Sequence, residues 1–502
     1  MPDSVDFSGK PFHFIGIGGI GMSALAYVLA KRQLPVYGSD LKSNHITQRL
    51  QKLGVHIFWE QEAKNLEVFT TRPNSAPPES ETRQRDNSSE AAIAPQELPQ
   101  VICSTAINPN NGEYQAAVAL GCPIFHRSDV LAALIQTHHS IAVAGTHGKT
   151  TTSSLIGYLL LQTGLDPTIV VGGEVEAWSG NARLGSSPYL VAEADESDGS
   201  LVKFESQVGV ITNIELDHPD RYQSLEEVTG IFRTFAQRCQ TTIGCIDCDV
   251  VRDRLKPDIT YSLDPQRGAD YTADTVQVSA EGTQAQIWER GTCLGELHLA
   301  LLGTHNLSNA LAAIAVGRSL GLDFARIAAA LQGFEGARRR FELLGVANQI
   351  RFIDDYAHHP SEIAATLSAA RLQVEGPTSP SRRLVAIFQP HRYSRTQTFI
   401  REFAAAFSDA DSVIIAPVYG AGEAPIPGVS SGHLAAAIAE HHQAVHTQPT
   451  LSELKTFLHD FLQPGDLALF LGAGDLNQIV PDLLDWHRQV EHERDHVQSS
   501  RS

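Results

Sequence analysis

One short loop restricts the possible folds of this chain more than any other feature. It follows the apolar stretch SIAVA, precedes an amphipathic helical pattern, and consists of Gly145, Thr146, His147, Gly148, Lys149, Thr150 and Thr151. Backbone N–H groups in such a loop, at the start of a helix, bind phosphate oxygens. Lys149 would reach the β- and γ-phosphates of a nucleotide, and Thr150 would bind magnesium. Val143 takes the place of the first glycine of the general pattern, but the setting predicts a nucleotide-binding α/β unit.

A second glycine-rich turn lies near the N-terminus, between the strand-like stretch PFHFI and a helical pattern. Its glycines are Gly16, Gly18, Gly19 and Gly21, and Asp40 ends the next strand-like stretch. The glycines allow a pyrophosphate to approach the backbone, and the carboxylate is placed to bind a ribose hydroxyl. A dinucleotide such as NAD and a UDP-sugar both carry these groups, so the residues leave the ligand open. A tight turn without a ligand is the simpler alternative.

Length and charge limit the classes of partner. The chain has 502 residues, enough for two or three hydrophobic cores, and its formal net charge of −19 opposes binding to nucleic acids and anionic membranes. No apolar run is long enough to span a bilayer, and the first residues do not form a secretory signal. We therefore expect a cytoplasmic protein with small-molecule partners, no nucleic acid and no membrane insertion. The oligomeric state is open.

The six cysteines do not form a pattern typical of a disulfide framework. They are few and irregularly spaced for a chain of this size. Cys245 and Cys248 make a C-x-x-C, but no second pair follows at the spacing of a zinc finger. We expect a buried strand followed by a turn at this position.

Strand and helix patterns alternate in three sections, which predicts mainly parallel sheets with helices on both faces. We expect domains at 1–137, 138–336 and 337–502, with the second joint in the run GFEGARRRFE. Residues 72–98 lose the apolar periodicity and are rich in Pro, Ser, Glu and Arg, so we expect a mobile insert there. In the third section, Phe399, Phe403 and Phe407 are spaced for one face of a single helix.

Acidic residues follow two strand-like stretches of the central section. Glu193 comes directly after YLVA, and His218 ends the polar run that follows VGVIT. Residues just past the ends of parallel strands face the ligand crevice beside a phosphate loop. Magnesium prefers oxygen ligands, which makes Glu193 a candidate and His218 a less obvious one. A capping role is the simpler interpretation of the histidine.

Arginine and histidine also gather in later loops. The run DDYAHHP covers 354–360, QPHRYSR covers 389–395, and three arginines occupy 338–340. Such clusters in an acidic chain favour an anionic ligand, although a single arginine is more often a solvated surface residue. A free amino acid also brings a carboxylate, and Arg392 and Arg395 lie just past the strand-like stretch LVAIF, where a guanidinium could bind it.

Taken together, these segments resemble the Mur ligase family. The segments are HFIGIGGIGMSALA, AVAGTHGKTTT, EADESDGS, TNIELDH, GTHNLSNALAA, RRRFE, DDYAHHPSEI, FQPHRYSRT and AGEAPIPGVS, which cover the chain from residue 13 to about 475 in family order. The resemblance implies an α/β chain with an N-terminal Rossmann-like domain that binds a UDP-sugar, a central P-loop ATPase-like domain and a C-terminal Rossmann-like domain. The insert at 72–98 is longer than the family pattern requires.

The resemblance also implies roles for individual residues. The loop from Gly145 to Thr151 would bind the ATP phosphates, and Asn306 and Asp355 would bind the adenine and ribose. The implied magnesium ligands are Thr150, Glu193 and His218, and the implied catalytic residues are Lys149, Arg340 and His391. The implied substrate-binding residues are Gly16, Gly18, Gly19, Gly21, Asp40, Ser104, Tyr356, Arg392 and Arg395.

The implied reaction joins L-alanine to the lactyl carboxylate of UDP-N-acetylmuramate during peptidoglycan precursor synthesis. The carboxylate would first take the γ-phosphate of ATP to form an acyl phosphate, which the amino group then attacks. A ligase of the same fold that attaches a whole tripeptide is the nearest alternative. A nicotinamide-dependent oxidoreductase would leave the phosphate loop without a role, and a nonenzymatic nucleotide-controlled binding protein is a third possibility.

Overall fold

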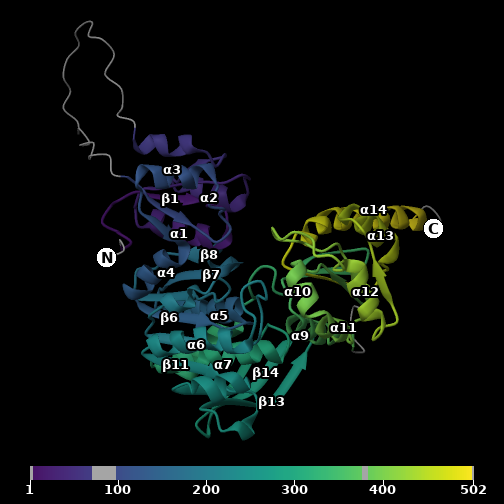
Figure 1. The fold of residues 1–502 in the computed structure, drawn as a ribbon. Helices are drawn as coiled ribbons and strands as arrows, with labels where there is room; N and C mark the ends of the chain where they lie inside the picture. Colours follow the sequence, from purple (N-terminus) through teal and green to yellow (C-terminus); the bar gives the residue numbers. More distant parts are fainter. Residues whose placement is uncertain (1–3, 71–97, 376–382, 500–502) are drawn as a thin grey trace.

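The computed structural model describes residues 4–70, 98–375 and 383–499. Three sheets follow one another along the chain (Figure 1). The first and second units are stacked, and the third lies to one side of the second. Nearly all of segment 72–98 lies outside the described residues, so its expected mobility stays a prediction. No helix among the described residues is long and apolar enough to cross a membrane.

The first sheet is fully parallel, with the strand order β3-β2-β1-β4-β5. Its strands are β1 (Phe12–Ile15), β2 (Val36–Ser39), β3 (His56–Phe58), β4 (Gln100–Cys103) and β5 (Ile124–His126), and its helices are α1 (Ile20–Lys31), α2 (His45–Lys52), the 3-10 helix η1 (Ala63–Phe69), α3 (Gly112–Leu120) and α4 (Arg127–Gln136). The apolar stretch of β1 is completely buried, which places the glycine turn at the edge of the sheet.

The central sheet has ten strands in the order β15-β14-β13-β12-β11-β10-β6-β9-β7-β8. They are β6 (His139–Ala144), β7 (Thr168–Val175), β8 (Gly180–Arg183), β9 (Tyr189–Glu193), β10 (Val208–Ile211), β11 (Thr241–Cys245), β12 (Ile259–Ser262), β13 (Tyr271–Ser279), β14 (Gly282–Glu289) and β15 (Thr292–Leu299). The pairings from β7 through β13 are parallel, and β8, β14 and β15 add antiparallel edges.

Helices cover the parallel part of this sheet. They are α5 (Lys149–Gln162), α6 (Leu225–Arg238), α7 (Thr304–Ser319) and α8 (Phe324–Gln332). The shorter helices are the 3-10 helices η2 (Glu176–Trp178), η3 (Ser200–Lys203) and η5 (Pro265–Arg267), and the π-helix η4 (Val251–Leu255). Cys245 ends the buried strand β11 and Cys248 lies in the turn after it, which confirms the structural interpretation of this C-x-x-C.

The third sheet has the order β16-β17-β21-β18-β19-β20, in which only β16 runs antiparallel. Its strands are β16 (Glu342–Ala347), β17 (Ile350–Asp355), β18 (Arg383–Phe388), β19 (Ser412–Ile415), β20 (Val445–Thr447) and β21 (Asp466–Leu471). Its helices are α9 (Pro360–Arg371), α10 (Tyr393–Thr398), α11 (Ile400–Ala405), α12 (Ser431–Ala439), α13 (Leu451–Phe461), η6 (Leu476–Ile479) and α14 (Val480–Ser499). Apolar clusters cover both faces, and the predicted α/β class with mainly parallel sheets is confirmed.

The predicted single helix through the three phenylalanines is wrong. Phe399, with φ −107° and ψ 25°, lies between the end of α10 and the start of α11, and Phe407 lies beyond the end of α11. The three side chains are still buried, and Phe403 and Phe407 both pack against Phe388. The spacing of the three phenylalanines therefore indicated a common buried face. Two short helices joined by a turn can form such a face as well as one helix can.

The proposed domain divisions fall between the sheets. β5 and β6 are joined by α4, and α8 ends before β16 begins at residue 342. The described contacts between the first and central units include the guanidinium of Arg49, which donates to the carbonyls of Trp178 and Ala182 at 3.3 Å. We retain 1–137, 138–336 and 337–502 as the proposed domains.

Candidate active site at the carboxyl ends of three sheets

The backbone of the phosphate loop requires glycine at two positions. Gly145 has φ 149°, and a Cβ there would lie 1.9 Å from Thr212 Oγ1. Gly148 has φ 79° and immediately precedes α5, and a Cβ there would lie 2.6 Å from Asn309 Oδ1. The loop therefore packs directly against the ends of β10 and α7, with Thr212 Oγ1 donating to the His147 carbonyl at 2.6 Å.

Lys149 begins α5 and points back into the loop. Its ammonium donates to the carbonyls of Gly145 at 2.7 Å and Thr146 at 3.1 Å, and to Glu196 at 2.9 Å. Burial opposes the charge, but the carboxylates of Glu196 and Asp195 outweigh it and hold the pKa of Lys149 above its usual value. The lysine is therefore charged and lies where a bound phosphate chain would meet the loop.

Two of the predicted magnesium ligands, Thr150 and Glu193, contact each other, and the third, His218, lies near Glu196, a partner of this lysine. Thr150 Oγ1 donates to Glu193 Oε1 at 3.1 Å, and the other carboxylate oxygen accepts from the Gly172 N–H at 2.6 Å. His218 has φ 54°, and its Nε2 lies 3.9 Å from Glu196 Oε1. Burial lowers the pKa of His218, which keeps its ring neutral. Two oxygen donors and a neutral nitrogen fit a hard divalent cation with one borderline ligand.

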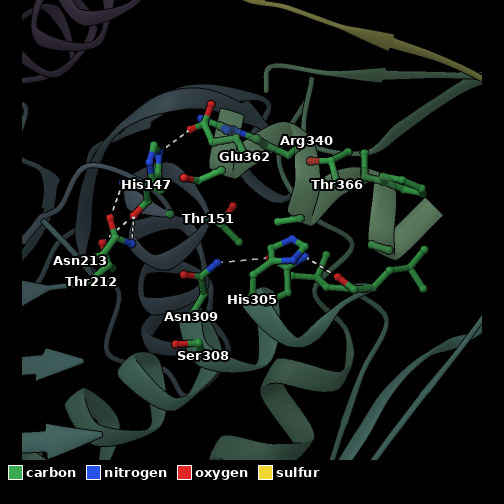
Figure 2. Close-up of a pocket in the computed structure, with 18 of the residues that line it drawn as sticks. His147, Thr151, Thr212, Asn213, His305, Ser308, Asn309, Arg340, Glu362 and Thr366 are labelled. Atoms are coloured by element: carbon green, nitrogen blue, oxygen red, sulfur yellow. Dashed lines mark hydrogen bonds and ion pairs between the residues drawn. The ribbon is translucent and has the colours of Figure 1, made fainter. Parts of the chain in front are cut away.

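A cavity of about 370 Å³ opens next to the loop (Figure 2). The central unit contributes His147, Asn306 and Asn309, and the third unit contributes Arg340 and Asp355 across the cavity. The cavity therefore lies between two units, and the predicted adenine, ribose and γ-phosphate residues all line it.

The polar groups of this cavity are partly engaged. Asn306 Nδ2 donates to the Leu302 carbonyl at 2.8 Å. The Asp355 carboxylate accepts from the Phe341 and Ala357 N–H groups, both at 2.8 Å, and burial raises its pKa to about 6. The Arg340 guanidinium lies over the Tyr356 ring, 5.2 Å from its centroid. The backbone bonds orient Asp355, and the stacked Arg340 keeps its charge near the cavity.

His147 connects the loop to the third unit. Its Nδ1 lies 3.0 Å from Glu362 Oε1 and its Nε2 lies 3.3 Å from Glu215 Oε2. Figure 2 shows the contact with Glu362 on one side of the cavity. Burial opposes protonation, but the two carboxylates outweigh it and raise the pKa of His147 to about 9. Sequence reasoning missed Glu362, whose only local signal is its capping-box position in α9.

The glycine turn of the first unit is held by Asp40. Its Oδ2 accepts from the Gly18 N–H at 2.8 Å, and a Cβ on Gly18 would lie 2.7 Å from the same oxygen. Gly16 has φ 80°, and Gly19 precedes α1 as its N-cap. A Cβ on Gly21 would lie 3.2 Å from Arg127 Nη1. Ser104 comes directly after β4, the strand that pairs with β1. The predicted UDP-sugar residues therefore share the carboxyl edge of the first sheet.

The predicted amino-acid residues lie at the same edge of the third sheet. The Arg395 side chain is 2% exposed and binds Asp217 through two bonds, Nε to Oδ1 at 2.9 Å and Nη2 to Oδ2 at 3.1 Å. Arg392 reaches Asp220 at 3.1 Å and Glu423 at 3.2 Å. His391 Nδ1 lies 3.2 Å from Arg395 Nη1, and burial lowers the pKa of His391 to about 3. Both guanidinium groups therefore have acidic partners in this arrangement.

Three sequence profiles match successive parts of the chain. The catalytic domain of the Mur ligase family matches residues 11–139, the Mur ligase middle domain matches 143–317, and the glutamate ligase domain matches 339–474. The UDP-N-acetylmuramate–L-alanine ligase of Nostoc punctiforme is 63% identical over 486 residues, covering 96% of this chain and 98% of that protein. The enzyme of the same name from Gloeothece citriformis is 60% identical over 492 residues, covering 96% and 99%.

Solved structures show the same arrangement. The UDP-N-acetylmuramate–alanine ligase of Thermotoga maritima has a TM-score of 0.76 at 28% identity, covering 96% of this chain and 99% of that one. A murein peptide ligase from Psychrobacter arcticus shares the fold, with a TM-score of 0.68 at 22% identity over 96% and 99% of the two chains. Profiles for all three sections and near-full-length relatives agree with the three sheets and their phosphate loop: this chain belongs to the Mur ligase family.

Proposed function

We propose that the protein joins L-alanine to the lactyl carboxylate of UDP-N-acetylmuramate, with ATP converted to ADP and phosphate, as a step of cytoplasmic peptidoglycan precursor synthesis. The observation that carries this proposal is the near-full-length identity of 60–63% to relatives with that substrate pair in their names. The convergence of the loop, the cavity and the arginine-rich third-unit edge supports it.

The proposed reaction has two chemical steps. The sugar-acid carboxylate attacks the γ-phosphorus, ADP leaves, and an acyl phosphate forms. The amino group of alanine then attacks the acyl carbon, and inorganic phosphate leaves from the tetrahedral intermediate as the amide forms. Lys149 and Arg340 would stabilise the negative charge on the transferred phosphoryl group. The third unit covers one side of the cavity and would limit hydrolysis of the acyl phosphate by water.

Magnesium and the amino acid have separate proposed sites. Thr150, Glu193 and His218 would hold magnesium, which neutralises phosphate charge when bound. Arg395 and Arg392 would receive the alanine carboxylate, and Tyr356 would be a further substrate contact. The neutral His391, 3.2 Å from Arg395 Nη1, would orient that guanidinium.

Release of ADP tests this function directly. We expect continuous release over many turnovers with ATP, Mg²⁺, UDP-N-acetylmuramate and L-alanine together, no release without UDP-N-acetylmuramate, and at most one equivalent per enzyme without L-alanine. Product mass should equal that of the sugar nucleotide plus alanine minus water. Release independent of alanine, or preference for a tripeptide over alanine, would contradict the proposal.

A further inference from the structure

Three side chains with metal-ligand atoms meet where the phosphate loop faces the start of α9. They are His147 from the loop, Glu215 from the segment after β10, and His359, the N-cap of α9. Their ligand atoms all lie within 4.8 Å of one another. Glu215 Oε2 lies 3.3 Å from His147 Nε2 and 3.9 Å from His359 Nδ1.

These separations suit a small tetrahedral ion. Bonds of about 2.0 to 2.1 Å around a tetrahedral zinc ion place neighbouring ligand atoms about 3.3 Å apart. Glu215 Oε2 and His147 Nε2 already have this separation, and Glu215 Oε2 and His359 Nδ1 exceed it by less than an ångström. A small movement of the His359 ring would therefore complete three corners of a tetrahedron.

The donor set selects the class of metal. Two imidazoles and one carboxylate suit zinc and similar transition ions, whereas magnesium prefers oxygen ligands alone. His359 is 4% exposed, and its Nδ1, the ring nitrogen that faces Glu215, accepts from the Ser361 N–H at 3.3 Å, a bond that a metal ion would replace. His147 presents Nε2 to Glu215 while its Nδ1 contacts Glu362 at 3.0 Å. A carboxylate on the second ring nitrogen is the usual way in which proteins orient a metal-binding histidine.

We propose that His147, Glu215 and His359 form a binding site for zinc or a similar transition-metal ion, separate from the magnesium ligands. A bound ion would replace the proton on His147 Nε2, which is released to solvent, together with the hydrogen bond from that nitrogen to Glu215. It would also link the phosphate loop of the central unit to α9 of the third unit. Because His147 and Glu215 line the nucleotide cavity, the ion and the nucleotide would oppose each other's binding.

Zinc titration of the full chain tests the site without using ligase activity. The protein is titrated with Zn²⁺ in excess Mg²⁺ and without substrates, in competition with a chromophoric zinc chelator. We expect one equivalent to bind, and His359→Asn to weaken binding at least about tenfold, because it removes one of three ligands. Asparagine is a good N-cap, so this change should preserve the start of α9.

His126→Asn is the matched control. His126 is also an N-cap whose Nδ1 accepts from the N–H two residues later at 3.3 Å, and Asp129 completes its capping box as Glu362 does for His359. This variant should bind zinc as the unmodified chain does. Glu193→Gln should also leave zinc binding unchanged, because it alters the proposed magnesium site alone.

Three results would overturn the proposal: no stoichiometric zinc binding in excess Mg²⁺, unchanged binding by His359→Asn, or an equal loss in Glu193→Gln. Glu215→Gln provides a second test if His359→Asn does not fold, because its side chain is 42% exposed and its change should also weaken zinc at least about tenfold. Since no substrate is present, failure here would leave the proposed ligase reaction unaffected.

Discussion

Two ion pairs cross the same boundary between the central and third units, and they differ in burial. In the pair Arg395–Asp217 the side chains are 2% and 6% exposed. In the pair Arg392–Asp220 they are 30% and 36% exposed. Both involve the same two loops, so one can serve as the control for the other.

The burial difference sets the expected magnitudes. Replacing Arg395 by Met leaves the Asp217 carboxylate buried without its partner, which should cost about 3 to 5 kcal/mol. Asp217→Asn in the same chain should recover part of that loss, giving a coupling energy of at least about 1.5 kcal/mol. The exposed pair should give a coupling of about 0.2 to 1 kcal/mol. Arg392 also contacts Glu423, so replacing Arg392 alone would not isolate the energy of its bond to Asp220, whereas a double-mutant cycle of Arg392 and Asp220 would.

Two double-mutant cycles measure these energies: Asp217→Asn with Arg395→Met, and Asp220→Asn with Arg392→Met. Urea unfolding compares the stability of the four variants of each cycle, and hydrogen exchange over 391–398 shows whether that region is affected. Both cycles report on the same boundary. A coupling below about 1 kcal/mol for the buried pair, equal to that of the exposed pair, would refute the reasoning from burial.

Four further changes test the proposed site. Lys149→Ala should abolish ligation and retain binding of UDP-N-acetylmuramate; more than about a tenth of the original kcat, a barrier change under ~1.4 kcal/mol, would exclude the assigned role. Glu193→Gln should raise the magnesium concentration needed for half-maximal rate, and an unchanged titration would remove it from the ligand set. Asp40→Ala should weaken the UDP-sugar without any specific NADH binding, which fluorescence would detect. Arg395→Ala should raise the KM for alanine by a factor that corresponds to a loss of about 2 to 5 kcal/mol in binding free energy, and it should change the KM for ATP far less. Equal changes in the two KM values would indicate that Arg395 only ties the third unit to the central unit.

Much of the fold follows from local patterns. The two glycine loops lie between a strand and a helix as predicted, because Gly145 and Gly16 have positive φ values that other residues rarely adopt. Glu193 and Asp40 lie at strand ends because alternating strands and helices form parallel sheets, whose carboxyl edges gather such residues. These are short-range consequences of sequence.

Contacts between units could not be predicted in this way. Glu362 is 215 residues from His147, and Arg395 is 178 residues from Asp217. No periodicity connects such pairs, because their meeting depends on how two independently formed sheets pack. The break at Phe399 has a similar origin, since a buried face is compatible with one helix or with two.

The bond between Arg395 and Asp217 has a consequence for amino-acid binding. Nε and Nη2 of Arg395 donate to the Asp217 carboxylate, and Nη1 contacts His391 Nδ1. The Nε and Nη2 pair of this guanidinium already binds Asp217, so a substrate carboxylate that binds through the same pair must displace Asp217. Asp217 lies one residue before His218, so its displacement would release a carboxylate next to a proposed magnesium ligand. Under the proposed function, alanine binding through this pair would exchange a contact between units for a contact with substrate, and the net affinity for alanine would be reduced by the stability of the contact that is replaced.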